Sequence, residues 1–155
     1  MPVVKLKELL DKNKVKYVSI RHSTAYTSQE IAASAHVKGR NMAKTVVVKL
    51  DGTMALAVLP AKYQIDFARL REAAGAGSAE LAAEEEFTKT FPGCETGAMP
   101  PFGELFGLRV YADETLSRDE EIAFNAGSHT ELIQLAYKDF ERLAKPKIAS
   151  FSVLR

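Results

Sequence analysis

Apolar side chains recur along the chain with two different periods, and each period predicts a different kind of element. Leu6, Leu9 and Leu10 follow helical spacing among lysines and a glutamate, which predicts an amphipathic helix that ends near Asn13. Residues 17–20 then carry apolar side chains in a short β-rich run, which predicts a strand soon after that helix.

The strongest local pattern is a pair of β-rich runs, residues 45–50 and residues 53–59, separated by two turn residues. Asp51 and Gly52 form the kind of pair that accepts the positive φ angles of a two-residue hairpin turn. The pattern therefore predicts an antiparallel β-hairpin. Pro60 is expected to end its second strand, because proline has no backbone N–H for the ladder.

The remaining predicted elements are shorter and alternate irregularly between helical and extended patterns. The predicted helices are one at 31–35 behind the capping box Thr27–Glu30, one capped by Asp66 with Phe67 and Leu70 on one face, a short one opened by Glu84–Glu86, and one with Phe140 and Leu143 that stops before Pro146. The predicted strands are 105–111 and 121–125, which flank a polar turn at 113–118, and a final strand through 148, 151 and 153. An extended piece is also expected to begin at 132. This order favours an α/β (α+β) fold with a mixed, largely antiparallel and curved sheet and packed helices.

Composition supports one compact domain over residues 1–155. With 46% hydrophobic and 26% charged residues, the chain lies within the range of globular domains and is long enough to bury one core. No apolar run approaches the ~20 residues of a membrane helix, and the first residues lack the apolar core of a signal peptide, so we expect a cytoplasmic protein with no membrane partner. The net charge of +1 argues against coating nucleic acid through overall charge, although a local basic patch stays possible.

Cysteine and histidine are too sparse to suggest a metal site or a disulfide. Cys94 is the one cysteine, and a free cysteine is most often a small buried hydrophobe, with a reactive thiol as the alternative. His22, His36 and His129 show no metal-ligand spacing. No Gly-x-Ser-x-Gly elbow, dinucleotide fingerprint or Walker loop occurs, so we expect neither a serine hydrolase nor a bound cofactor.

Lys44 stands just before the first strand of the predicted hairpin. Counting by two places it on the same face as Val46 and Val48, so that it ends the more apolar face of that strand. A lysine there provides a fixed positive charge for a phosphate or a developing oxyanion. The alternative is a side chain whose stem packs along the core while its ammonium reaches water.

A glycine- and proline-rich segment from Pro92 to Gly103 is long enough to be a functional loop. Its glycines permit close backbone approach and its prolines stiffen the chain, which suits the presentation of backbone dipoles to a carbonyl or a water. A rigid connection between two elements is the alternative. Farther along, Asn125–His129 has the pattern of a turn that leaves a strand, and Asn125 and His129 are polar side chains of the kind that line pockets.

Four segments of the sequence are considered together: His22 with Tyr26–Ala32, then Ala43–Val48, then the loop Gly97-x-x-x-Pro101-Phe102-Gly103, and finally Phe124–His129. In their order and approximate spacing they resemble the YbaK/ProX aminoacyl-tRNA deacylases, which are relatives of the editing domain inserted in bacterial prolyl-tRNA synthetase. The resemblance covers nearly the whole chain and rests on the conjunction of the motifs. One departure is the pair Pro100-Pro101, which stands where family members vary.

The resemblance implies a compact mixed-sheet domain that hydrolyses the ester between a wrong amino acid and the 3′ end of a tRNA, without metal or cofactor. Lys44 matches the family's functional lysine, and Gly97 and Pro101 match its Gly-x-x-x-Pro loop, so these three are the candidate catalytic residues. The candidate substrate-binding residues implied in the same way are His22, Thr45, Ala98, Met99, Pro100, Phe102, Gly103, Asn125, Gly127 and His129. The implied partners are the 3′ end of an aminoacyl-tRNA and an aminoacyl-tRNA synthetase.

Residue chemistry and resemblance combine in one hypothesis, in which water attacks the ester carbonyl while Lys44 holds the terminal nucleotide and the Gly97–Pro101 backbone positions the water or stabilises charge. The family suggests alanine or cysteine on tRNA(Pro) as the amino acid removed. Editing is needed because a binding pocket discriminates against a wrong small side chain by only about 10- to 200-fold for each methylene group. A second interpretation is a noncatalytic module that binds tRNA ends, a synthetase or a nucleotide-bearing ligand. A third is a small-molecule hydrolase that uses Cys94 or His129.

Overall fold

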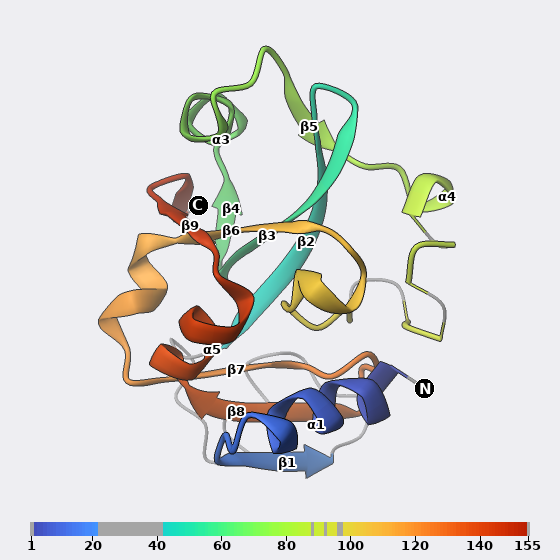
Figure 1. Ribbon diagram of the computed structural model, residues 1–155. Helices are drawn as coiled ribbons and strands as arrows, with labels where there is room; N and C mark the ends of the chain where they lie inside the picture. The colour runs from blue at the N-terminus through green and yellow to red at the C-terminus, as the bar shows by residue number, and fades with distance from the viewer. Residues whose placement is uncertain (1, 22–41, 88, 92, 96–97, 155) are drawn as a thin grey trace.

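The computed structural model describes residues 2–21, 42–87, 89–91, 93–95 and 98–154. Its elements, labelled as in Figure 1, are the helices α1 (Pro2–Lys12), α3 (Phe67–Ala74), α4 (Glu84–Phe87) and α5 (Tyr137–Ala144), the 3-10 helices η2 (Gly103–Leu105) and η3 (Glu114–Arg118), and the strands β1 (Tyr17–Arg21), β2 (Ala43–Leu50), β3 (Thr53–Pro60), β4 (Tyr63–Ile65), β5 (Ala79–Leu81), β6 (Arg109–Asp113), β7 (Glu121–Asn125), β8 (Glu131–Ala136), β9 (Lys147–Ala149) and β10 (Ser152–Leu154).

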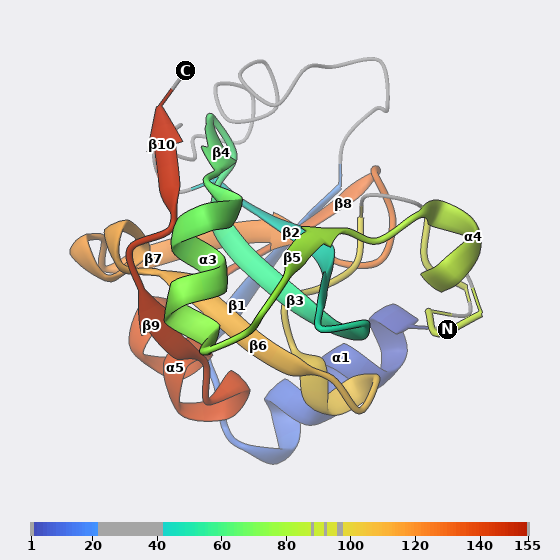
Figure 2. The same ribbon diagram turned by 90° about the horizontal axis from the view of Figure 1, so that it is seen from above.

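Two sheets stack on each other with the main core between them (Figure 1). One sheet has five strands in the order β5-β2-β3-β6-β9, and the other has three in the order β1-β8-β7. The pairs β3–β6 and β6–β9 are parallel, whereas the other pairs of these sheets are antiparallel. Strands β4 and β10 form a separate antiparallel pair, seen side by side in Figure 2. The predicted α/β fold with mixed, largely antiparallel sheets is confirmed.

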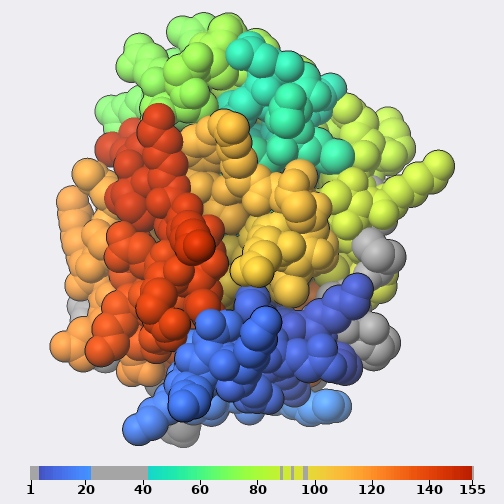
Figure 3. Space-filling model, viewed as in Figure 1, coloured from blue at the N-terminus to red at the C-terminus, as the bar shows by residue number. Residues whose placement is uncertain are grey.

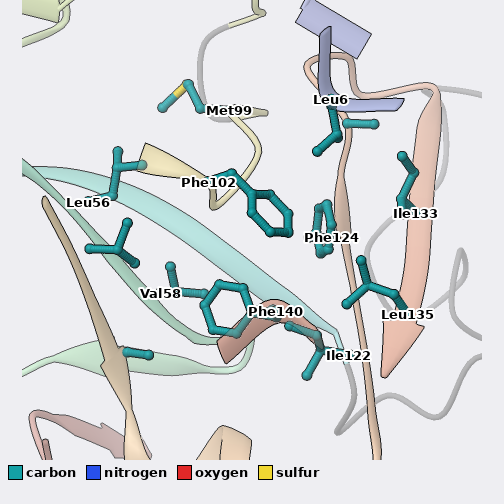
Figure 4. Packing of buried hydrophobic residues seen from close by; sticks show 14 of the residues in the cluster. Leu6, Leu56, Val58, Met99, Phe102, Ile122, Phe124, Ile133, Leu135 and Phe140 are labelled. Atoms are coloured by element: carbon teal, nitrogen blue, oxygen red, sulfur yellow. The ribbon is translucent and has the colours of Figure 1, made fainter. Parts of the chain in front are cut away.

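The main core joins aromatic and aliphatic side chains from both sheets and from the helices around them (Figure 4). The ring of Phe102 lies 5.6 Å from that of Phe124 and 5.8 Å from that of Phe140, both measured between centroids. Leu6 of α1 is fully buried against the same cluster. In Figure 3, α1 borders the segment around residues 100–108, so both cover the core on this face.

A second apolar cluster covers the opposite face of the five-stranded sheet, where α3 lies over the strands (Figure 2). Leu70 of α3 and Phe151 are both fully buried there, against Val48 and Leu59 among others. Both faces of β2 are therefore buried. The face that carries Thr45 is the more polar one by residue type, yet it is buried as well, because Thr45 is only 6% exposed and points toward the main core with Val47.

The predicted hairpin is confirmed as β2 and β3, which pair from Ala43–Pro60 to Leu50–Thr53. Asp51 and Gly52 both have positive φ, 52° and 81°, as the two-residue turn requires. The Asp51 carboxylate also accepts hydrogen bonds from the N–H groups of Gly77 and Ser78, at 2.9 Å each to Oδ1. The hairpin turn is thus joined to the start of β5, which pairs with β2.

The helices of the described residues occur where the sequence predicts them, at α1, α3, α4 and α5. Asp66 caps α3 through bonds to the N–H groups of Ala68 and Arg69, as expected. The helix predicted at 31–35 and its capping box lie outside the described residues. Within the described ranges, no helix is both long enough and apolar enough to cross a membrane.

Two predictions about extended segments are wrong in detail, and the predicted polar turn takes a 3-10 helical form. The strand expected at 105–111 begins only at Arg109, because Gly103–Leu105 forms a 3-10 turn and Gly107 adopts a φ of 69°. The polar turn after β6 is the 3-10 helix η3, which Asp113 caps. The single C-terminal strand is two strands, β9 and β10, in different sheets.

Asp113 explains why the C-terminal strand is divided. Its carboxylate is 1% exposed and accepts the N–H groups of Phe151 at 2.9 Å and Ser152 at 3.0 Å. These two bonds take backbone donors that a continuous strand would give to a neighbour. The chain therefore leaves β9 beside β6 and continues as β10 beside β4.

Candidate active site

The structure describes all predicted site residues except two. His22 and Gly97 lie outside the described residues. The others fall into three regions: the start of β2, the segment 98–103, and the turn after β7.

Lys44 is the second residue of β2 and pairs with Leu59 of β3. Its side chain leaves the strand on the face shared with Val46 and Val48, as predicted, and is only partly exposed. Burial lowers the pKa of the Lys44 ammonium from its usual value. Among the described residues no carboxylate forms an ion pair with it. Lys44 is therefore a partly dehydrated cation that an incoming anion would stabilise.

Thr45 faces the opposite side of β2 from Lys44, toward the main core. Its hydroxyl oxygen is buried and has no hydrogen-bond partner within the described chain. An unpaired buried hydroxyl is uncommon, because the lost bond to water is not replaced. Lys44 and Thr45 consequently lie on different faces of β2.

The start of β2 also meets the three-stranded sheet. Met42 and Ala123 form an isolated parallel bridge, so the start of β2 lies beside the middle of β7 and the two strands run in the same direction. Two residues farther along each strand stand Lys44 and Asn125, and Asn125 is the last residue of β7. This bridge brings the strand that carries Lys44 to the strand that leads into the predicted pocket turn.

The described part of the Gly-x-x-x-Pro loop is buried rather than projecting. Residues 98–103 are all buried, and Met99 and Phe102 belong to the main core. The Phe102 side chain is fully enclosed between Phe124 and Phe140. These side chains fasten the loop to the core, so packing fixes the path of its backbone.

Gly103 is required by close packing. A Cβ at this position would lie 2.0 Å from the Leu108 carbonyl oxygen and 2.8 Å from a methyl carbon of Val110. The Gly103 carbonyl accepts the N–H groups of Phe106 and Leu108, both at 2.9 Å. The loop thus ends in a tight turn that only glycine allows.

Few backbone donors of this loop are free for a ligand. The Ala98 N–H donates to the Glu95 carbonyl at 3.0 Å, and Pro100 and Pro101 have no N–H. No hydrogen bond among the described residues uses the Met99 N–H. Within residues 98–101, Met99 is therefore the one residue whose N–H is not accepted by another described residue.

The turn after β7 is joined directly to this loop. Gly127 has a φ of 96°, and its N–H donates to the Ala98 carbonyl at 2.8 Å. Its own carbonyl accepts the Glu95 N–H at 2.9 Å. The structure therefore brings together two motifs that are about 30 residues apart in sequence. Asn125 opens this turn, and His129 is exposed on it.

Two polar residues beside these motifs were not predicted as site residues. The Ser128 hydroxyl donates to the Glu95 carboxylate at 3.0 Å and contacts the Thr130 hydroxyl at 2.7 Å. The available sequence signal was their position: Glu95 stands two residues before Gly97, and Ser128 lies inside the Asn125–His129 motif.

Cys94 has the character of a structural thiol. It is half-buried and packs against the main core. Burial raises the pKa of the Cys94 thiol to about 11, so the nucleophilic thiolate is scarce at neutral pH. No group of three or more His, Cys, Asp or Glu residues suited to a metal ion occurs in the part of the chain that the structure describes.

Residues 22–143 match the model of the aminoacyl-tRNA editing domain. The chain belongs to the aminoacyl-tRNA editing domain family. This confirms the resemblance drawn from the sequence, together with the predicted class of enzyme, an aminoacyl-tRNA deacylase.

Relatives of this editing domain fall into two kinds. The multifunctional Ser/Thr-tRNA deacylase ProXp-y of Escherichia coli (strain K12) is 37% identical over 114 residues, which are 70% of this chain and 68% of that protein. The proline–tRNA ligase of Lysinibacillus sphaericus is 29% identical over 90 residues, which are 58% of this chain and only 16% of the ligase.

A solved structure shares the fold of this editing domain over nearly its whole length. It is described as a candidate trans-editing enzyme for prolyl-tRNA synthetase, with a TM-score of 0.83 and 20% sequence identity. The match covers 98% of this chain and 97% of the other. At this identity the comparison establishes the fold.

Proposed function

We propose that the protein removes wrong amino acids from tRNA in trans, as a free-standing editing hydrolase that works in the cytoplasm. The solved structure with the same fold matches along the full chain rather than as a segment of a synthetase, which supports a domain of residues 1–155 that acts on its own. The ligases among the relatives make a synthetase a reasonable partner for tRNA delivery.

The observation that carries the proposal is Lys44, a partly buried ammonium without a carboxylate partner among the described residues. Burying a cation without an anion is unfavourable, and a tRNA 3′ end supplies phosphate and sugar oxygens that relieve this cost. Lys44 would thereby fix the terminal nucleotide and hold the ester in place.

The proposed reaction is hydrolysis of the aminoacyl ester by water. The water oxygen attacks the ester carbonyl carbon, and the bond from that carbon to the ribose oxygen breaks. The ribose oxygen takes up one proton of the water and becomes a hydroxyl, while the other proton goes to solvent and the amino acid leaves as a carboxylate. The Met99 N–H would stabilise charge on the carbonyl oxygen, and Gly97 and Pro101 would set the path of the backbone. The raised pKa of Cys94, about 11, favours this route over attack by the thiol.

For the amino acid we propose serine or threonine first, because the relative that is 37% identical is a Ser/Thr-tRNA deacylase by name. Alanine and cysteine on tRNA(Pro), which the sequence resemblance suggests, remain the second choice. The pocket side chains proposed to make this choice are His22, Asn125 and His129, together with Gly127 in the turn; the Thr45 hydroxyl points to the main core and is left out of this proposal.

The test is deacylation of purified aminoacyl-tRNAs by substoichiometric enzyme. The panel holds Ser-, Thr-, Ala- and Cys-tRNA, each on its own tRNA and on tRNA(Pro). We expect multiple turnovers on at least one member, at a rate that Lys44→Ala abolishes. Lys49→Ala is the matched control, since Lys49 lies on the same strand and pairs with Glu86 at the surface.

A noncatalytic tRNA-end module is the competing function. It predicts binding of the uncharged 3′ end, weakened by Lys44→Ala, with no turnover on any member of the panel. That result would contradict the hydrolase and replace it with the binding module.

A further inference from the structure

The segment 93–95 and the loop that follows it are held by the turn after β7 through three hydrogen bonds. Gly127 contributes two of them, an N–H to the Ala98 carbonyl at 2.8 Å and a carbonyl to the Glu95 N–H at 2.9 Å. The third joins the side chains of Ser128 and Glu95 at 3.0 Å. Glu95 therefore meets the turn with both its backbone and its carboxylate.

The directions of these side-chain bonds follow from proton counting. Ser128 has one hydroxyl proton, which it donates to the Glu95 carboxylate, because an ionised carboxylate only accepts. The 2.7 Å contact between the hydroxyls of Ser128 and Thr130 must then be donated by Thr130. The Thr130 N–H also donates to the Ser128 hydroxyl, at 3.1 Å. The donors thus converge on Ser128 and end on one charged acceptor, Glu95.

The turn that carries Ser128 is anchored to the neighbouring strands and helix. The Ala126 N–H donates to the Glu131 carbonyl at 3.0 Å, so the turn closes on the first residue of β8. The buried Glu131 carboxylate binds Lys7 of α1 at 2.9 Å and accepts a hydrogen bond from Ser19 of β1. The loop is consequently held against a part of the fold that is itself anchored to α1 and β1.

We infer that Glu95 is a positioning residue for the proposed deacylation, and that Glu95 and Ser128 form a clamp that sets the Ala98–Pro101 backbone relative to the Asn125–His129 turn. This inference rests on the proposed function. Glu95 acts through the loop, because its Oε1 accepts the Ser128 hydroxyl proton and its N–H donates to the Gly127 carbonyl. If the clamp is lost, the loop can shift the water relative to the ester carbonyl. Such a shift lowers the rate of hydrolysis even though every chemical group is still present.

The clamp is exposed, so it contributes little to global stability. If the Glu95 carboxylate had a purely structural role, its removal would therefore leave the activity of the folded enzyme unchanged. A positioning carboxylate changes kcat and leaves KM, which reports mainly on the tRNA contacts, nearly unchanged.

The experiment measures kcat and KM for Glu95→Ala, Ser128→Ala and the double variant on the best substrate of the wild-type enzyme. We expect each single variant to lower kcat about tenfold with KM within twofold, and the double variant to lose no more than either single one. Glu95→Gln keeps an acceptor oxygen and is expected to retain at least a third of wild-type kcat. The control is Glu104→Ala, which removes an exposed carboxylate from the neighbouring turn η2.

Amide hydrogen exchange gives a readout that is independent of turnover. In Glu95→Ala and Ser128→Ala the N–H groups of Glu95 and Gly127 are expected to exchange about tenfold faster, while those of β2 and β3 keep their rates. Wild-type kcat in Glu95→Ala, or a loss confined to KM, overturns the clamp and leaves the hydrolase intact. An inactive wild-type enzyme overturns the hydrolase and the positioning role together.

Discussion

The β2–β3 hairpin and the pair formed by the 93–103 segment and the 125–130 turn contribute to the candidate site in opposite ways. The hairpin carries Lys44 on a strand that is buried on both faces and paired along its whole length. The second region brings together segments about 30 residues apart through the bonds of Glu95, Gly127 and Ser128. Lys44 is held by packing, whereas the loop is held by hydrogen bonds and by one tight turn at Gly103.

This difference separates two kinds of failure. A change at Lys44 removes a charge from a scaffold that stays in place. A change in the second region keeps the chemical groups but moves them.

Lys44→Met keeps the aliphatic stem and removes the charge. We expect kcat to fall about 100-fold or more, the scale seen when one preorganised charged contact is lost. Stability should stay equal or rise, because the lowered pKa of Lys44 means that its protonated form is disfavoured in the folded state. Urea unfolding and deacylation kinetics measure the two effects. A variant that is both inactive and clearly destabilised contradicts the assignment of Lys44 to function.

Gly103→Ala tests the tight turn that ends the loop. A Cβ 2.0 Å from a backbone carbonyl oxygen forces the backbone to move, and we expect a loss of about 3 kcal/mol in the free energy of unfolding. The control is Gly107→Ala, which meets nothing within 4 Å but has a φ of 69°, so about 1 kcal/mol is expected. Equal losses in the two variants, measured by urea unfolding, would show that crowding at Gly103 is relieved at no cost.

Acid unfolding tests the two buried carboxylates that frame the fold, Asp113 and Glu131. Burial alone would raise the pKa of each, but hydrogen bonds outweigh it: Thr115 and the Phe151 N–H lower the pKa of Asp113, and Ser19 and Lys7 lower that of Glu131. Both groups bind protons more weakly when folded. Their stabilisation is therefore complete above the unfolded pKa values, about 4, and is lost as the pH falls through the lower folded values.

Asp113→Asn should remove part of this pH dependence. We expect it to lower stability at pH 7 by about 2 kcal/mol and to flatten the fall of stability between about pH 5 and pH 2. Urea unfolding across that pH range provides the measurement. If stability falls between about pH 5 and pH 2 as steeply in Asp113→Asn as in the wild type, Asp113 is excluded as a source of the pH dependence.

Cys94→Ala is expected to produce the smallest change. Turnover should stay within twofold of the wild type, because a thiol with a pKa of about 11 is not an effective nucleophile at neutral pH. The folded protein should also react with iodoacetamide at pH 7.5 more slowly than the urea-unfolded chain does. Loss of activity in Cys94→Ala would disprove hydrolysis by water alone.

Local patterns predicted the fold where neighbours in sequence decide the structure. The Asp51-Gly52 turn, the Asp66 cap and the Glu84–Glu86 helix start are all specified within a few residues, and all are confirmed. The division of the C-terminal strand was missed, because it depends on Asp113, nearly 40 residues away. Strands of three residues, β4 and β5, were missed because they are too short for a period to be visible.

The candidate site divides in the same way. The strand face of Lys44 followed from a period of two and is confirmed. The burial of the face that carries Thr45 was not predicted, because it depends on a second sheet packing against the first. Glu95 and Ser128 were missed because no pattern within one segment indicates that each is the other's partner.

The three-stranded sheet has a consequence for the order in which the protein is assembled. β1 pairs with β8 from Tyr17–Leu135 to Arg21–Glu131, so its register joins residues more than a hundred positions apart. The β2–β3 hairpin closes over two residues and is available early during synthesis, whereas β1 must wait until residues 131–136 have been made. Until then Val18, which stays 56% exposed even in the finished fold, belongs to a strand without a partner. A nascent chain of this protein therefore depends on the late arrival of β8 to protect its first strand from pairing with other chains.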